Sequence, residues 1–389
     1  MLVKGKTQRK TSESSKADCN YDTPTHRKER IGLIRKGGNK MDKMRSLLLI
    51  WVGTFLLSAC ATVSYVDIQT FNPAEVTFPE YVRKVLIVNN AAPQPSDEGY
   101  SYTLYGVKQD TCRAKVDSAL FEASRSLGET ILEGAYFNDV LLYNQPLRID
   151  SFYLSDPKLT PAQVTALCEA NGADAIISWD RLLFEMKKEV DRLGEGLILG
   201  TVDVRMGGVL RSYLPGKEGP LATVVVGDSI SWAESANGEN MLDELLPTAE
   251  EALSMAGQYI GAKATPNFVP HWINETRWYF SGMGSQWKEA AAYAATDKWD
   301  KANARWKQLY DRSKGKDKAR AASNLALSEE MSGHLDKARE WAQRSYELFK
   351  QYAGEKDDVT QLLKLYHEAL TERIQKDLKL NVQFGEESY

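Results

Sequence analysis

The chain has 389 residues, with 49 Lys or Arg against 53 Asp or Glu, and its formal net charge is −4. Hydrophobic residues make up 43% of it, so there is material for two folded cores. The acidic balance argues against a nucleic-acid partner, because binding to phosphates rests on an excess of Lys and Arg.

The first forty residues form a basic, polar segment with no apolar periodicity. Residues 1–40 therefore predict a disordered extension, or a start assigned too far upstream. In the second case translation begins at Met41 or Met44, next to the charged residues of the following segment.

Residues 41–59 predict a lipoprotein signal peptide. Two basic residues precede an uncharged apolar run from Leu47 to Leu57, which is too short to span a bilayer. The run ends in Leu57-Ser58-Ala59-Cys60, which resembles a lipobox, where the cysteine is lipidated before cleavage. We therefore expect lipid on Cys60 to hold the mature chain to a membrane. The alternative is a membrane anchor that contains an incidental cysteine.

The region after the cleavage site indicates where such a lipoprotein would reside. Removing residues 1–59 takes away 13 basic and 5 acidic residues, which leaves 36 against 48 and a net charge near −12. No acidic cluster follows Cys60. By resemblance to lipoprotein sorting rules, this implies an outer-membrane lipoprotein that faces the periplasm, with an inner-membrane or Gram-positive surface location left open.

The first half of the mature chain alternates between strand and helix signals. Residues 83–88 and 139–143 are short apolar runs of buried-strand length, and residues 110–127 between them place alanines and leucines on one helical face. A capping box at Thr160-Pro161-Ala162-Gln163 starts another helix, which Asn171-Gly172 ends.

The signals then change to a meander. Residues 173–185 predict a strand, and alternation around Val202 to Met206 predicts a second strand with one solvated face. A turn at 215–220 makes Gly200 to Trp232 a hairpin, and residues 241–262 predict a closing helix. We therefore expect residues 60–264 to form an α+β domain with a mixed sheet.

The mature chain keeps two thiols besides Cys60, namely Cys112 and Cys168. An oxidising compartment permits these two to pair, so they are candidates for a disulfide. Buried unpaired cysteines are the alternative.

The C-terminal part predicts an all-α array. Residues 265–282 carry several aromatic side chains and predict a linker through which the array docks on the first domain. Residues 283–389 contain no proline, and Trp299-Asp300-Lys301-Ala302 is followed 36 positions later by Leu335-Asp336-Lys337-Ala338. This spacing is close to the tetratricopeptide period, so we expect a tetratricopeptide-like helical array. Four aromatic residues are candidates for a partner-binding groove or for the repeat core: Tyr293, Trp299, Trp306 and Trp341.

Two resemblances follow from these patterns. The run Val85 to Val88, the helix before Val140 and the helix ending at Asn171-Gly172 resemble the α/β domain of lipoproteins related to curli-secretion and penicillin-binding-protein activator proteins. The whole mature chain resembles a lipoprotein family of unknown function from Bacteroidetes with tetratricopeptide-like repeats. Both resemblances bear on the fold more than on the function.

No catalytic or metal-binding motif is evident. The histidines lack zinc-ligand spacing, and Asp174, Asp180 and Glu185 lie too far apart along one strand for paired-carboxylate catalysis, so we interpret them as a solvated sheet edge. We therefore expect a non-enzymatic adaptor or envelope assembly factor without a cofactor, which binds another envelope protein or peptide. Alternatives are an oligomeric outer-membrane secretion-pore subunit that uses the hairpin at 200–232, and an envelope hydrolase.

Overall fold

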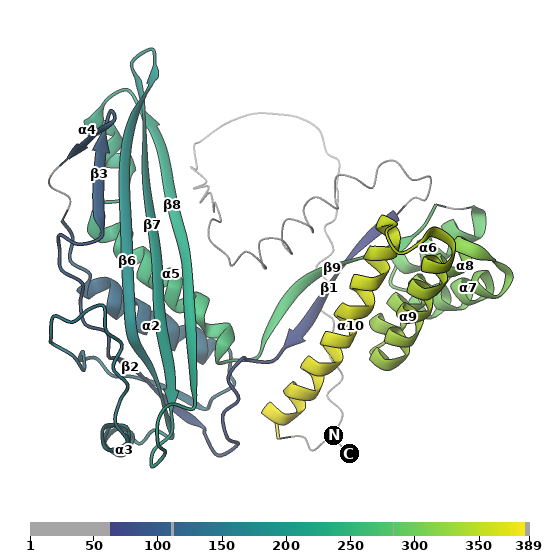
Figure 1. Ribbon diagram of the computed structural model, residues 1–389, viewed down its shortest axis with the longest axis horizontal. Helices are drawn as coiled ribbons and strands as arrows, with labels where there is room; N and C mark the ends of the chain where they lie inside the picture. The colour runs from purple at the N-terminus through teal and green to yellow at the C-terminus, as the bar shows by residue number, and fades with distance from the viewer. Residues whose placement is uncertain (1–62, 110–112, 283, 386–389) are drawn as a thin grey trace, which may run out of the picture.

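The computed structural model describes residues 63–109, 113–282 and 284–385 and shows a mixed-sheet part and a helical part joined by a two-stranded ribbon (Figure 1). The predicted fold class is thereby confirmed. The predicted extension, signal peptide and lipidation site at Cys60 lie outside the described residues, as does Cys112.

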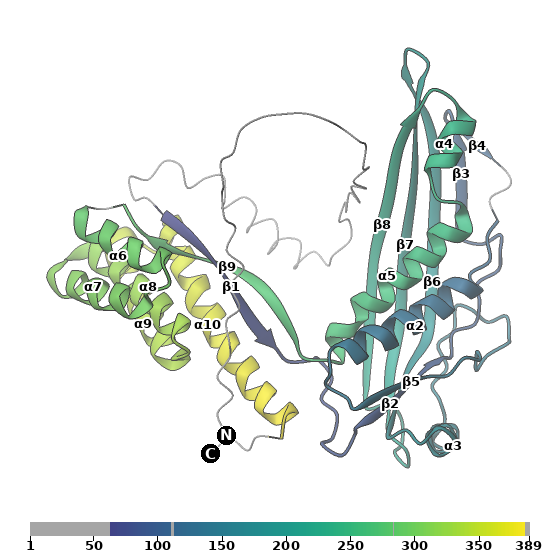
Figure 2. The same ribbon diagram turned by 180° about the vertical axis from the view of Figure 1, so that it is seen from behind.

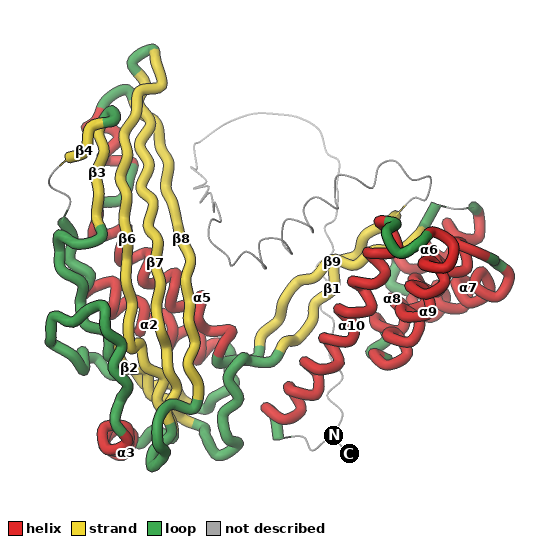
Figure 3. The backbone as a smooth tube through the Cα atoms, in the orientation of Figure 1, coloured by secondary structure: helices red, strands yellow, loops and turns green. Residues whose placement is uncertain are grey.

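The sheet combines parallel and antiparallel pairing. It contains β2 (Lys84–Asn89), β3 (Tyr100–Leu104), β4 (Val107–Gln109), β5 (Asp139–Leu142), β6 (Ala175–Gly194), β7 (Leu197–Tyr213) and β8 (Ala222–Ala236). The central strand β6 pairs in parallel with β2 and β3 on one side and antiparallel with β7 on the other, and β8 follows β7 at the edge. Figure 3 shows that β6, β7 and β8 run the full height of this part.

Helices cover the sheet unevenly. Helices α2 (Asp117–Glu133) and α5 (Ala249–Ala264) lie across one face, together with the short α4 (Glu239–Leu245) (Figure 2). Gly257 and Gly261 of α5 let these two helices touch, because an added Cβ would lie 2.2 Å from the carbonyl oxygen of Ala119 and 2.4 Å from that of Ala123. Helix α3 (Pro161–Asn171) packs against the opposite face, over Leu86, Val88 and Ile176.

A β-bulge in β6 decides which side chains reach the core. The register with β7 shifts between Trp179 and Arg181. Before the shift, Ile177 and Trp179 point to the α2 and α5 face, and after it Leu182 does. The extra residue, Asp180, is fully buried, so the interpretation of this residue as part of a solvated sheet edge is wrong.

Two local expectations need revision. The helix expected at 241–262 is two helices, α4 and α5, because Pro247 interrupts it and Thr248 starts α5 with a capping box to Glu251. The hairpin expected at 200–232 is longer, since β7 and β8 have 17 and 15 residues. The capping box of α3 at Thr160 and Gln163 is present as predicted.

The predicted aromatic linker, residues 265–282, contains a short 3-10 turn, η2 (Thr265–Asn267), and strand β9 (His271–Phe280). Strand β9 pairs antiparallel with β1 (Val63–Asn72), a segment that the sequence had placed in the α/β domain. The two ends of the linker belong to different cores. Phe268 and Val269 pack into the sheet part, whereas Tyr279 and Phe280 pack into the helical part.

The helical part contains α6 (Ser285–Ala295), α7 (Trp299–Arg312), α8 (Gly315–Met331), α9 (Leu335–Ala353) and α10 (Asp358–Gln383). Each helix packs against the next one in the chain. Four alanines related by the 36-residue spacing are completely buried between them: Ala290, Ala302, Ala326 and Ala338. Small side chains at these positions allow neighbouring helices to approach closely, which explains the sequence repeat.

The end of α10 makes the contact between the two parts. The Gln383 side chain accepts a hydrogen bond from the Ala74 amide at 3.1 Å and donates one to the Ala74 carbonyl at 3.0 Å. The Tyr136 hydroxyl donates to the Gln383 carbonyl at 3.0 Å, and the Phe384 ring lies 5.6 Å from the Tyr136 ring. Docking therefore involves the C-terminal helix as well as the predicted linker.

Candidate protein-binding site

The strongest candidate for a binding site is a loop that covers the α3 face of the sheet. We call residues 148–156 the apolar loop. Three of its large apolar side chains are directed to solvent, because Ile149 is 95% exposed, Phe152 72% and Leu154 62%. Single exposed apolar residues are normal on a protein surface, but three within six residues make this loop a candidate binding surface.

A buried arginine holds the apolar loop in one conformation. Arg148 is only 9% exposed. Its guanidinium donates to both carboxylate oxygens of Asp150, at 2.8 and 2.6 Å. It also donates to the Phe152 carbonyl at 3.0 Å, and to the Ser155 carbonyl and hydroxyl at 3.1 and 3.0 Å. Five charge-assisted hydrogen bonds within eight residues fix a loop that has no regular secondary structure.

The electrostatics of the loop agree with this geometry. The hydrogen bonds from Arg148 and, next, from the Phe152 amide lower the pKa of Asp150 to about 2. The carboxylate therefore stays ionised at any physiological pH and keeps its contact with Arg148. Arg148 and Asp150 neutralise each other within the loop, and Asp156 is paired with Arg211 of β7, which leaves the apolar side chains as the outward chemistry of the loop.

A second buried cluster lies beneath the C-terminal end of the loop and centres on Asp180. The Asp180 carboxylate accepts hydrogen bonds from Ser178 at 2.6 Å, from Tyr213 at 2.7 Å, from Arg211 at 2.7 Å and from Asn90 at 3.1 Å. Burial, and then the charge of Asp180, raises the pKa of Tyr213, so its hydroxyl remains a donor. All four donors to the Asp180 carboxylate are protein groups, and only the Arg211 Nε of these side chains is buried without a partner, so we assign the cluster a structural role.

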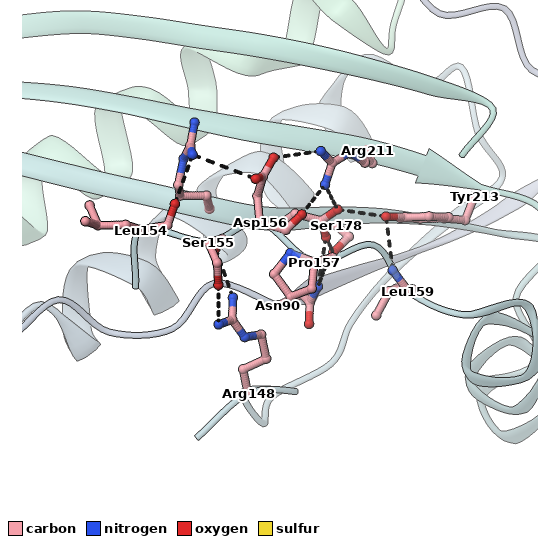
Figure 4. Close-up of polar contacts among 12 residues, drawn as sticks. Asn90, Arg148, Leu154, Ser155, Asp156, Pro157, Leu159, Ser178, Arg211 and Tyr213 are labelled. Carbon is pink, nitrogen blue, oxygen red and sulfur yellow. Dashed lines mark hydrogen bonds and ion pairs between the residues drawn. The ribbon is translucent and has the colours of Figure 1, made fainter. Parts of the chain in front are cut away.

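The Asp180 cluster is tied directly to the loop (Figure 4). Arg211 also donates to the Asp156 carboxylate at 2.7 Å and to its carbonyl at 2.9 Å. Asn90 donates to the Pro157 carbonyl at 2.9 Å, and Arg181 donates to the Leu154 carbonyl at 3.0 Å. The C-terminal end of the apolar loop is therefore anchored to the sheet.

A shallow pocket of about 330 Å³ borders the loop on the uncovered face of β6 and β7. Tyr153 of the loop lines it together with Glu98, Leu183, Arg205 and Gly207. A partner that covers the apolar loop would also contact this mixed apolar and polar surface. The loop would then correspond to the apolar core of a protein interface, and the pocket to its polar rim.

A larger pocket, of about 640 Å³, lies at the turn between β6 and β7. Its polar side chains bind one another, because the Tyr105 hydroxyl donates to Glu239 at 2.9 Å and the Arg192 guanidinium stacks 4.5 Å from the Tyr105 ring centre. Much of the remaining lining comes from glycines, such as Gly194 and Gly196. We therefore do not select it as a catalytic site.

Among the residues that the structure describes, no group of three or more His, Cys, Asp or Glu side chains is arranged to hold a metal ion. No helix among residues 63–109, 113–282 and 284–385 is long and apolar enough to cross a bilayer.

The cysteine prediction is only partly visible. Cys168 on α3 is 3% exposed, and its thiol is free in the structure. Burial and, secondarily, the charge of Asp174 raise the pKa of this thiol to about 11. Cys112 lies outside the described residues, so the disulfide stays a prediction.

The four aromatic residues proposed for a groove or a repeat core are brought together in the helical part. Trp306 is completely buried and Trp299 is 8% exposed, and their ring centres lie 6.4 Å apart. Tyr293 and Trp341 are half-buried against the same core. The structure therefore gives these rings a packing role.

The sequence analysis missed the apolar loop. The sequence does contain three apolar residues, Ile149, Phe152 and Leu154, between Pro146 and Pro157. Their spacing has no helical or strand periodicity that would tell an exposed loop from a buried segment. A second signal in the same stretch is the spacing of Arg148 and Asp150, which permits an ion pair within the loop. The distant anchors Asp180 and Arg211 could not be connected with it without the fold.

Comparisons with known families agree with the division of the chain. Residues 82–280, just over half of the chain, match the family described as "Domain of unknown function (DUF8603)". The chain therefore belongs to the DUF8603 family. Residues 288–372 match a second family, "Domain of unknown function (DUF6340)". The DUF8603 match covers the sheet part and ends with β9, and the second match lies within the helical part. No curated protein matches the chain.

Proposed function

We propose that this protein is a lipid-anchored adaptor or assembly factor of the cell envelope, which binds another protein and has no catalytic activity or cofactor of its own. The observation that carries the proposal is the apolar loop, with three exposed large side chains on a backbone fixed by Arg148. The fold supplies the rigid scaffold beneath it.

Rigidity and exposure together favour binding. A flexible loop loses conformational entropy when it docks, which weakens the complex, whereas a loop already fixed avoids most of this loss. Burying one side chain of this size contributes roughly 1.5 to 3 kcal/mol. Ile149, Phe152 and Leu154 would therefore supply the apolar contacts at the centre of such an interface.

The proposed location of the protein, at a membrane of the cell envelope, rests on the sequence alone. Lipid on Cys60 would place the folded chain at a membrane surface, and the residues after it favour an outer-membrane lipoprotein facing the periplasm. The first described strand, β1, begins at Val63, so the folded part would follow the lipid after only two residues.

A secretion-pore subunit is the second candidate, favoured by the length of the β6 and β7 strands, which have 20 and 17 residues. Their apolar face is covered, however. A Cβ added at Gly200 of β7 would lie 2.7 Å from the side chains of both Leu242 and Leu246, so α4 and the residue after it pack directly on the strand. A pore would require these contacts to break, which makes the adaptor the better-supported function.

Co-purification tests the proposal. The mature chain is isolated from detergent-solubilised membranes of its own cells, either unchanged or with Ile149, Phe152 and Leu154 all replaced by Ser. Replacement of Leu365 by Ser on α10 provides the matched control, because this leucine is 48% exposed and lies in the other part. We expect a stoichiometric partner with the unchanged and control chains and none with the loop variant, at equal melting temperatures. Equal recovery of the partner by all three chains would refute the assignment to the loop.

A further inference from the structure

Strand β8 presents an open edge of the sheet. Within the described part of the chain it pairs only with β7, along its whole length of 15 residues and without a register shift. It contains no Pro and no Lys, two residues that commonly protect edge strands from pairing. Such an edge offers main-chain hydrogen-bonding groups to another strand on both sides of Ser229, whose own amide donates to the Asp228 carboxylate at 2.9 Å.

The side chains along β8 alternate between two chemistries. On the α5 face, Val226, Ile230 and Trp232 pack against the core but stay partly exposed. Met255 on α5 extends this apolar surface beyond the strand, since it lies one turn from Tyr259 and is 38% exposed. The apolar layer of the sheet part is therefore continuous up to the open edge.

The other face of β8 is lined by small residues. Gly227, Ser229, Ser231 and Ala233 occupy successive positions on this face, after Val225, which is 78% exposed. Small side chains leave room for the residues of an incoming strand. Two charges share the α5 face of β8. Asp228 is neutralised within the chain by Lys263 at 3.1 Å and by the Tyr259 hydroxyl at 2.9 Å, and Glu234, near the C-terminal end of the strand, is exposed to solvent.

The arrangement of the two parts of the molecule favours a single extended segment over a second copy of the chain as the partner that pairs with β8. Figures 1 and 2 show β8 as the strand nearest to the ribbon of β1 and β9 and to α10, which stand on the same side of the molecule. A second copy paired through β8 would have to place its own sheet and helices on that side. A single extended segment needs much less space.

We propose that β8 binds an extended segment of another protein, which adds a strand to the sheet through main-chain hydrogen bonds. The segment has apolar residues at every second position, facing Val226, Ile230, Trp232 and Met255, and small or polar residues between them. This is β-strand addition, in which the ladder supplies affinity and the alternate side chains supply specificity. The site is separate from the apolar loop, which packs on the α3 face of β6 and β7 and not at the β8 edge, so one adaptor could hold two partner segments.

The test uses the unaltered mature chain, so that no substitution in β8 can disturb folding. The probe is a 15-residue peptide that alternates Val or Ile with Ser or Thr and carries Lys at both ends for solubility. Two matched peptides have the same sequence but carry N-methyl groups on the odd-numbered or on the even-numbered amides. Because a strand pairs through one edge only, N-methylation of one set removes the ladder hydrogen bonds while the other set leaves them intact.

We expect the parent peptide and one N-methylated peptide to bind, and the other to bind at least tenfold more weakly. Amide hydrogen exchange within residues 222–236 should slow at least tenfold on binding. Three results would overturn the proposal: no binding by the parent peptide, equal binding by both N-methylated peptides, or exchange in β8 that the peptide does not change. Protection of β8 before any peptide is added, together with a dimeric mass, would show instead that a second copy occupies the edge.

Discussion

Replacement of Glu330 by Gln is expected to destabilise the junction between the ribbon and the helical part. The Glu330 side chain is completely buried on α8. Its carboxylate accepts hydrogen bonds from Arg277 of β9 at 3.1 Å, from Tyr366 of α10 at 2.8 Å and from Arg373 of α10 at 2.6 Å. One carboxylate therefore joins three elements that are distant in sequence.

The magnitude follows from the burial of the partners. Removing one member of a buried ion pair costs roughly 3 to 5 kcal/mol, because the remaining charge is left without compensation. Here Arg277 keeps a second carboxylate, that of Glu275, and the Arg373 side chain is 26% exposed and so partly solvated. We therefore expect a loss of about 2 to 3 kcal/mol in the free energy of unfolding, just below that range.

Urea denaturation followed by tryptophan fluorescence measures this loss, since Trp278, Trp299, Trp306 and Trp341 all lie in the ribbon and the helical core. Glu340→Gln on the exposed side of α9 is the matched control and should change the free energy by less than about 0.5 kcal/mol. An effect of Glu330→Gln no larger than that of the control would show that the ribbon and the helices do not depend on this cluster.

Three further outcomes are expected. Cys60→Ala should shift the protein from the detergent phase to the aqueous phase or leave it as a precursor, and unchanged membrane retention would contradict the lipoprotein assignment. The carboxyl of Asp150 should titrate near pH 2 when followed by NMR. Its contact with Arg148 is therefore present above the ordinary pKa of 3.8 and is lost as the pH falls from about 4 through 2. In Arg148→Met the titration midpoint should return towards 3.8. Cys168 should resist alkylation at pH 8 in the folded chain, because its thiol is buried and has a pKa of about 11. Mass spectrometry after alkylation in denaturant without reductant counts the thiols and decides whether Cys112 pairs with it.

The sequence was informative wherever a local pattern reflects a local cause. The capping box at Thr160 and Gln163 predicted the start of α3, because a hydroxyl and an amide three residues apart satisfy the first free amides of a helix. The 36-residue spacing of Ala302 and Ala338 predicted the helical array, because close helix packing needs a small residue at equivalent places.

It was uninformative where distant residues decide the outcome. Strand β1 pairs with β9 more than 200 positions away, so nothing near Val63 indicates a ribbon. Asp180 looked like a residue on a solvated strand because the bulge that turns it inward has no sequence signature. Its partners are also distant in sequence, since Asn90 follows β2 and Arg211 lies in β7. The apolar loop escaped notice for the same reason, since the fold decides which apolar residues remain exposed.

The central claim is that the apolar loop binds another protein because it is held rigid. Site-specific photo-crosslinking in living cells tests it most directly, with a photoreactive amino acid at Phe152 and, for comparison, at Leu365 on α10. We predict one discrete adduct from position 152, its loss when Arg148→Met releases the loop without unfolding the chain, and no such adduct from position 365. The same adducts from both positions, or an adduct at 152 that Arg148→Met leaves unchanged, would contradict the claim.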